Sequence, residues 1–266
     1  MRLIAACFAV FLSAMPLAAS ERVERLMLAL QLEQVVDILR DEGLAQAKDL
    51  NDTFLGGDGG PFFDDQVDEI YDPQWMQEQI SGIFEVSLTA SQMDRAILFF
   101  ESDVGQTVIT LENSARRAFA DETIKDMARE NYLNGAGGTQ LYRLVGEYIE
   151  VNDLIEKNVQ SSLSSDYNFF RGLSADAGTS SEDILAQLLS DKDRLTEENR
   201  IWLYSFLLVA YQPLDEAQMR ENIAFSRTET GRAVNEAFFD GFDKMYDQIY
   251  FQLGQAVSRA LGASDL

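Results

Sequence analysis

The chain has 266 residues, which is enough to bury a substantial hydrophobic core in one or two domains. Its 45 acidic residues outnumber 21 basic ones, and the formal net charge of −24 predicts repulsion from nucleic acid and anionic membrane surfaces. There is no histidine and a single cysteine, Cys7. Catalytic and metal sites that depend on histidine are therefore excluded.

The N-terminus has the three parts of a signal peptide. Arg2 supplies the positive start, residues 3–17 are apolar, and Ala18-Ala19-Ser20 is a small-residue cleavage site. The apolar run is too short to span a membrane, and no second run approaches membrane length. We predict a signal peptide over residues 1–20, a periplasmic location, no membrane insertion, and no thiol once Cys7 has been removed.

Helical periodicity runs through the rest of the chain, prolines are few, and alternating strand patterns are absent, so the predicted fold class is all-α. Between the first helices, residues 55–61 read as a loop and residues 58–72 as a solvated acidic segment. Calcium is unexpected there because the EF-hand spacing is missing. In the first half, helices are predicted over 23–39, from Pro73 through Phe84, over 89–100 and over 102–119.

The second half begins after a glycine-rich segment. Residues 134–138 read NGAGG and are predicted to be a linker between two units. Helical patterning resumes at Leu141, and the small polar residues of 174–181 suggest an insertion. Thr196 is a candidate N-cap for a further helix that ends before Pro213.

Two segments of the chain resemble each other. Leu88–Val108 and Leu214–Val234 share 7 identities in 21 ungapped positions, where unrelated segments would share about one or two. Trp75 and Trp202 stand 13 and 12 residues before these segments. The pattern predicts two tandem related helical repeats, over 21–133 and 139–266, packed around a shared core.

A weaker similarity extends the duplication upstream. Leu32–Asp37 and Val151–Glu156 match in residue type at an offset of 119 residues, against 126 for the main segments.

Each copy of the main segment predicts two helices joined by a capped corner. Ser102 and Thr228 can accept a hydrogen bond from the first turn of the second helix. Gly105 and Gly231 fall in that turn, where glycine lowers helix stability. Close approach of another backbone is the expected reason for both glycines, and a ligand-binding corner is the alternative.

The corners FESDVG (100–105) and SRTETG (226–231) resemble the signature of a secreted proteobacterial helical family, a domain of unknown function numbered twenty fifty-nine. That signature is aromatic-x-Ser/Thr-Pro-x-Gly, after a Thr/Ser-x-x-Glu/Gln helix start that Thr89–Gln92 fits and Asp215–Gln218 fits with aspartate as the cap. This chain has Asp103 and Glu229 in place of the proline. The resemblance implies an all-helical periplasmic fold and supplies no catalytic residues.

The C-terminal helix is apolar over a wide arc, which is typical of a helix buried on two sides. One stripe contains Phe238, Phe242, Met245 and Ile249. The other contains Phe239, Tyr246 and Tyr250. Core packing between the repeats is the leading interpretation of these stripes, and the alternative is that Phe239, Tyr246 and Tyr250 form an interaction surface for a homodimer, a protein partner or a small apolar ligand.

The leading functional hypothesis is a non-enzymatic binding or interaction module of the periplasm. Carboxylates are the catalytic groups that remain, so one alternative is a carboxylate-dependent hydrolase acting on the cell envelope. A carrier of small apolar ligands is the other. A deep cleft with two carboxylates would favour the hydrolase, and a closed apolar cavity would favour the carrier. No catalytic, cofactor-binding or metal-binding residue and no cofactor is predicted.

Overall fold

The computed structural model describes residues 15–135, 137–174 and 180–264, and these residues form helices and turns without a strand. The predicted all-α fold class is confirmed. Residues 1–14, which hold most of the predicted signal peptide, lie outside the described residues. So do residues 175–179, which hold most of the predicted insertion.

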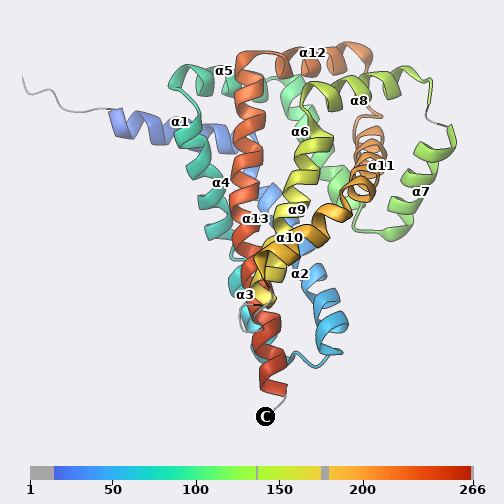
Figure 1. The fold of residues 1–266 in the computed structure, drawn as a ribbon. Coiled ribbons are helices and arrows are strands. Elements are labelled where there is room, and N and C mark those ends of the chain that lie inside the picture. Colours follow the sequence, from blue (N-terminus) through green and yellow to red (C-terminus); the bar gives the residue numbers. More distant parts are fainter. Residues whose placement is uncertain (1–14, 136, 175–179, 265–266) are drawn as a thin grey trace, which may run out of the picture.

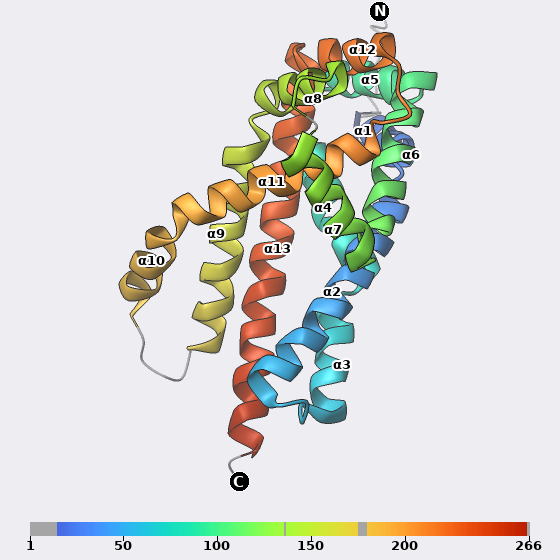
Figure 2. The ribbon, with the colours of Figure 1, turned by 90° about the vertical axis from the view of Figure 1, so that its right-hand side faces the viewer.

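Thirteen described helices follow one another along the chain. The first half contains α1 (Met15–Ala29), α2 (Leu32–Leu55), α3 (Gly60–Ile70), α4 (Pro73–Ser87), α5 (Ala90–Phe100) and α6 (Asp103–Ala118). Helix α7 (Glu122–Gly135) connects it to α8 (Gln140–Val151), α9 (Leu154–Leu173), α10 (Ser181–Ser190), α11 (Lys192–Ala210), α12 (Glu216–Ser226) and α13 (Glu229–Ser264). Helix α13 runs the height of the molecule, with α5 and α12 across its wide end and α2, α3 and α9 beside it at the narrow end (Figures 1 and 2).

The helix predicted over 23–39 is broken in the middle. Gln31 has φ 52° and ψ 39°, which turns the chain between α1 and α2. Asp153 has nearly the same angles, φ 52° and ψ 38°, between α8 and α9. Aligning these two left-handed residues pairs Leu32 with Leu154, at an offset of 122 residues in place of the predicted 119.

Three other local predictions also differ from the structure. The predicted acidic segment 58–72 contains α3, because Phe63 and Val67 form a buried apolar face between its aspartates. Thr196 lies inside α11 and donates to the Lys192 carbonyl, since the helix begins earlier than predicted. The predicted linker is shorter than 134–138, because α7 continues through Gly135.

The two predicted corners have the same hydrogen bonds. Helices α5 and α12 both begin with a capping box, from Thr89 and Asp215 respectively. The Ser102 hydroxyl accepts from the Gly105 N–H at 3.1 Å, and the Thr228 hydroxyl accepts from the Gly231 N–H at 2.9 Å.

Both corner glycines are in close backbone contact, as predicted. A Cβ on Gly105 would lie 2.1 Å from the Phe99 carbonyl oxygen, and one on Gly231 would lie 2.1 Å from that of Phe225. The second helix of each corner therefore sits against the end of the first helix at a distance that only glycine permits.

An ion pair recurs in the two halves with its charges exchanged. Arg25 of α1 pairs with Glu101 at the end of α5, and Glu147 of α8 pairs with Arg227 at the end of α12. Between the corners, the rings of Phe99 and Phe225 stack with centroids 3.9 Å apart. These correspondences support the proposed duplication.

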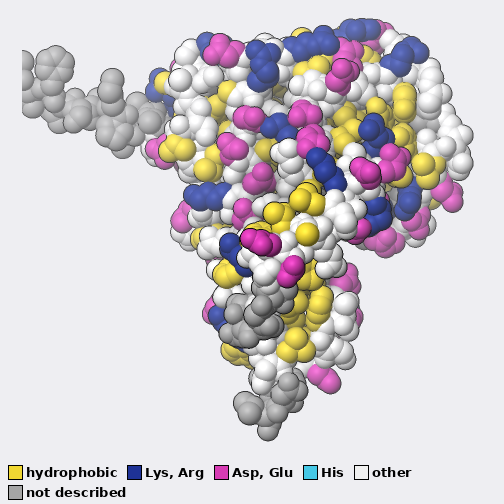
Figure 3. Space-filling model, in the orientation of Figure 1, with side chains coloured by type: hydrophobic (Ala, Val, Ile, Leu, Met, Phe, Trp, Pro, Cys, Tyr) yellow, Lys and Arg dark blue, Asp and Glu magenta, His cyan; other side chains and the backbone are white. Residues whose placement is uncertain are grey.

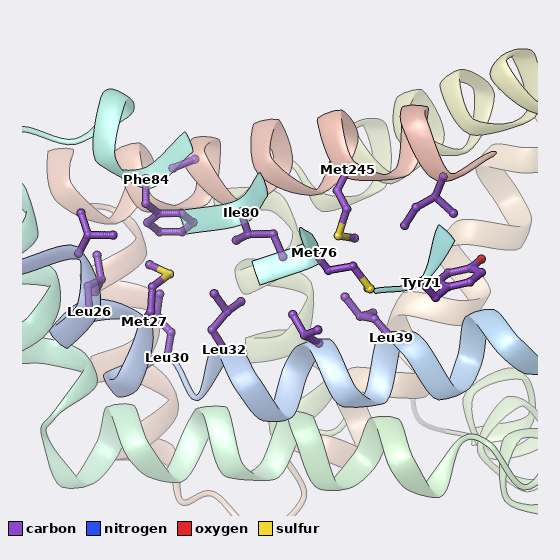
Figure 4. Packing of buried hydrophobic residues seen from close by; sticks show 14 of the residues in the cluster. Leu26, Met27, Leu30, Leu32, Leu39, Tyr71, Met76, Ile80, Phe84 and Met245 are labelled. Atoms are coloured by element: carbon purple, nitrogen blue, oxygen red, sulfur yellow. The ribbon is translucent and has the colours of Figure 1, made fainter. Parts of the chain in front are cut away.

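The buried residues form two clusters in place of the single shared core that we predicted. One contains residues of α1 through α5 and α13, with Ile109 of α6 and Phe169 of α9, and the other contains residues of α6 through α8, α11 and α12. In the first cluster, Met245 of α13 points toward Met76 and Ile80 of α4, with α2 on the far side (Figure 4). Each half therefore contributes its last helix to the other half's cluster.

Acidic and basic side chains are interspersed over the wide end of the molecule (Figure 3). Hydrophobic side chains also reach the surface, as on α10, where Leu185 and Leu189 are exposed.

Candidate functional site

A cavity of ≈250 Å³, which we call the central cavity, lies where the two halves meet. Helices α2, α5, α6, α8, α11, α12 and α13 all supply side chains to its wall. Most of the lining is apolar: Leu30, Val35, Phe100, Val108, Ile109, Phe206, Phe225, Val234, Phe238 and Phe242. The polar lining comprises Glu112, Asn113, Arg116, Tyr148, Asn152, Asn222, Ser226 and Asn235. Such a wall suits an apolar molecule that is oriented by a few polar contacts.

Two polar side chains of the cavity wall, Glu112 and Tyr148, share Tyr211 as a neighbour. The Tyr211 hydroxyl donates to the Glu112 carboxylate, and Tyr148 is the next polar neighbour of Tyr211. Burial raises the pKa of the Glu112 carboxyl, against the opposing effects of the Tyr211 hydrogen bond and the Arg116 charge. Burial likewise raises the pKa of Tyr148. Tyr211 is fully buried, while Glu112 and Tyr148 are half-buried, so the hydrogen bonds among them are partly shielded from water.

Asn222 has an unused hydrogen-bond donor in this environment. The residue is 4% exposed, and no hydrogen bond of normal geometry reaches its Nδ2, although the Tyr148 phenol lies nearby. A buried amide without a partner costs about 1–3 kcal/mol, so native proteins rarely leave one unsatisfied. The sequence offered one signal for this residue: Asn222 is three positions after Met219 and so shares the buried face of α12.

Arg116, which lines the central cavity, is paired with Glu42. The guanidinium donates to both carboxylate oxygens, with the closest contact at 2.8 Å from Nε to Oε1. Burial alone would lower the pKa of Arg116, but the hydrogen bond and charge of Glu42 outweigh it and raise that pKa. This bidentate geometry fixes the arginine, because two parallel bonds hold its plane.

A second pocket of ≈320 Å³, the α9 pocket, lies on the other side of Arg116, between α2, α9 and α13. Its wall is more polar than that of the central cavity. Helix α9 contributes Asn158, Ser161, Ser162, Ser165 and Asp166, and the opposite wall contributes Glu42, Gln46, Tyr246 and Tyr250.

The predicted interaction residues of α13 lie on the side that faces α9. Tyr246 and Tyr250 line the α9 pocket. Phe239 lies under the ammonium group of Lys157 of α9, which is 5.2 Å from the ring centroid. All three side chains are partly buried, so the structure shows them at an internal contact between helices.

The chemistry available in these sites is limited. Glu112 is the one carboxylate in the central cavity lining, and Arg116 engages both oxygens of Glu42 in the α9 pocket. In the part of the chain that the structure describes, no three acidic, histidine or cysteine side chains gather to hold a metal ion. None of the described helices is both long and apolar enough to cross a membrane.

Residues 74–131 match the sequence model of a family described as "Uncharacterized protein conserved in bacteria (DUF2059)". The matched region covers α4, α5, α6 and most of α7, and so contains the first corner. It is the family that the corner motif resembles, and the model detects one copy. Comparison with curated proteins and with solved structures found no match.

Proposed function

We propose that the protein is a non-enzymatic binding protein that holds a small, largely apolar molecule in the central cavity. The observation that carries this proposal is the buried Nδ2 of Asn222, which makes no hydrogen bond of normal geometry, at the wall of a cavity that is lined largely by apolar side chains. A ligand with an apolar body and one hydrogen-bond acceptor would bury its body against the phenylalanine rings and satisfy the amide. This favours the carrier among the hypotheses derived from the sequence.

The proposed duplication adds a second argument. Positions that correspond in the two halves have diverged in polarity where they line the cavity: Leu30 and Asn152, Phe100 and Ser226, Glu112 and Phe238, Arg116 and Phe242. A cavity wall that differs in polarity between the two halves suits an asymmetric ligand, with an apolar body and a polar group.

The hydrolase hypothesis receives less support. Glycoside hydrolysis needs two carboxyl groups on opposite sides of the scissile bond, and the central cavity lining contains Glu112 alone. In the α9 pocket, Glu42 is tied to Arg116, which leaves Asp166 without a free partner.

The binding proposal is tested with two compounds of similar size, acetophenone and ethylbenzene. Both have an apolar ring, but only acetophenone offers a carbonyl acceptor. We expect acetophenone to raise the melting temperature of the protein more than ethylbenzene does, since a ligand that binds the native state stabilises it. Replacing Asn222 with leucine should weaken acetophenone binding about fivefold, which corresponds to a net hydrogen bond of about 1 kcal/mol.

Two control variants sharpen this test. Ethylbenzene should bind Asn222→Leu at least as well as it binds the unaltered protein, and Asn131→Leu, on the exposed side of α7, should change neither affinity. Val35→Trp should block both compounds, because Val35 lines the cavity and is only partly buried. The proposal fails if neither compound shifts the melting temperature, or if Asn222→Leu leaves the preference for acetophenone intact.

We further propose that the protein acts in the periplasm after removal of residues 1–20. The features that support this are Arg2, the apolar run 3–17 and the small residues before Glu21. The buried residues of α1 begin at Val23 among the side chains described, so cleavage before Glu21 would leave that face intact. N-terminal sequencing of protein recovered from the periplasm should begin at Glu21, within one or two residues. An intact Met1, or retention in the cytoplasm, would contradict export.

A further inference from the structure

The α9 pocket differs from the central cavity in the side chains that α9 directs into it. Asn158, Ser161, Ser162, Ser165 and Asp166 line the pocket from one helix. Their spacing of three and four residues places them on a single face. The inward face of a packed helix is normally apolar, so this polar stripe needs a reason other than packing.

Some polar side chains on this helix form hydrogen bonds within the protein, and others do not. The hydroxyls of Ser161 and Ser164 donate to Asp243 and Asp247 of α13, the latter at 2.6 Å. In contrast, no described residue forms a hydrogen bond with the hydroxyls of Ser162 and Ser165, which face the pocket. Each hydroxyl can donate one hydrogen bond and accept two. The pocket thus presents a pair of hydrogen-bonding groups to whatever fills it.

Aromatic rings from α13 also line the pocket. Tyr246 and Tyr250 lie one turn apart on α13, with ring centroids 6.0 Å apart. The Tyr250 hydroxyl donates to the Gln46 side-chain oxygen at 2.9 Å, which holds its ring in place. A pocket lined by both aromatic rings and hydroxyls suits a ring that has a C–H face and a rim of hydroxyl groups.

The charges in the pocket restrict the ligand further. Arg116 is neutralised by Glu42, and Asp166 adds a second carboxyl without a countering base in the lining. Burial raises the pKa of Asp166, against the charge of Arg194. The pocket is therefore neutral or negative, and it disfavours phosphate and carboxylate groups.

We propose that the α9 pocket binds a neutral polyhydroxylated ring, such as a pyranose sugar, with its C–H face on Tyr246 and Tyr250 and its hydroxyls on Ser162 and Ser165. The alternative occupant is water alone, which a roomy polar pocket also accommodates. This inference does not depend on occupation of the central cavity.

The test uses the full chain with glucose, N-acetylglucosamine and myo-inositol, and glucuronate as an anionic comparison. Saturation-transfer NMR should detect at least one neutral compound at millimolar concentration, with weaker transfer to glucuronate. Replacing Ser162 and Ser165 together with alanine should lower the affinity about tenfold, which corresponds to about 1.4 kcal/mol. Ser164→Ala is the matched control, because Ser164 lies on the same helix outside the pocket lining. The affinity of Ser164→Ala for the neutral compounds should stay within about twofold of the affinity of the unaltered protein.

A second measurement covers the case in which the double variant does not fold. In the unaltered protein, the C–H protons of the bound ring should show transferred nuclear Overhauser effects from tyrosine ring protons. Absence of binding by all three neutral compounds, absence of those effects, or an affinity that the double variant leaves unchanged would overturn the proposal and leave water as the occupant. Asn222→Leu should not alter sugar binding, so failure here is distinct from failure of the central cavity proposal.

Discussion

At the scale of single residues, Gly105 shows how a short backbone contact determines the outcome of a substitution. Because a Cβ there would lie 2.1 Å from a carbonyl oxygen of the preceding helix, backbone must move to accommodate it. We expect Gly105→Ala to destabilise the protein by about 1–3 kcal/mol, as overpacking does. Thermal or urea unfolding would measure the change, and Gly231→Ala should behave in the same way for the same reason.

Gly82 is the matched control for this prediction. It lies inside α4 with no atom within 4 Å of the added Cβ. Alanine has the higher helix propensity, so Gly82→Ala should stabilise the protein by up to about 1 kcal/mol. A raised melting temperature for Gly105→Ala would contradict a close backbone contact at the corner.

Glu112 links the central cavity to the pH dependence of stability. Its pKa is raised in the folded protein, chiefly by burial. The folded state therefore holds the proton more tightly than the unfolded state, and this stabilisation is lost as pH rises from the ordinary glutamate pKa through the raised one. At neutral pH the buried carboxylate lowers the free energy of unfolding.

We therefore expect Glu112→Gln to raise the melting temperature at pH 7. The glutamine can still accept the Tyr211 hydrogen bond, and it carries no charge. The gain should shrink as pH falls through the raised pKa of Glu112 toward the ordinary glutamate pKa of about 4.3, below which the original carboxyl is neutral in both states. Glu33→Gln, at an exposed position of α2, serves as the control. A stabilisation that is the same at every pH would contradict the role of ionisation.

At the scale of helices, two glycines allow α9 and α13 to touch. A Cβ on Gly172 would lie 2.2 Å from the Phe251 carbonyl oxygen, and one on Gly254 would lie 2.1 Å from that of Phe169. The backbones approach each other directly, since no side chain separates them at this crossing. We expect Gly254→Ala to push the helices apart and destabilise the protein by about 1–3 kcal/mol. Unfolding melts measure the loss, and an unchanged midpoint would mean that the helices can separate at no cost.

The sequence predicted that the chain is helical, but it did not predict where several helices begin and end. The corners at Ser102 and Thr228 were identified correctly because a cap and a glycine are local signals. Gln31 and Asp153 carry no comparable signal, since neither is a glycine, yet both adopt the left-handed conformation. Helix α3 was missed because its acidic residues outnumber the few apolar ones that it buries.

The candidate site was less predictable, because it depends on which helices meet. The sequence singled out Tyr246 and Tyr250 through their helical spacing but could not show that α9 covers them. Asn222 of α12 and Glu112 of α6 lie 110 residues apart in the sequence. Their convergence at one cavity follows from the exchange of α6 and α13 between the halves, which no local pattern encodes.

At the scale of the whole molecule, that exchange predicts that neither half folds alone. Helix α13 covers Met76, Ile80 and Phe84 of α4, and the Phe84 and Phe238 rings meet edge to face with centroids 4.9 Å apart. On the other side, Phe119 at the end of α6 meets Phe206 of α11 edge to face at 5.5 Å. A chain of residues 21–133 would expose the α4 face to water, at a cost of about 25 cal/mol per Å² of apolar surface.

Residues 21–133 and 139–266 should therefore each lack a cooperative thermal transition when produced separately. Mixed in equal amounts, they should associate and recover the helical circular dichroism and a cooperative melt, because each supplies the helix that the other half lacks. A chain of residues 21–266 cleaved at Gly137, in the turn after α7, is the positive control, since it begins from the assembled state. A cooperative transition in either isolated half would show that it closes its own cluster without the exchanged helix.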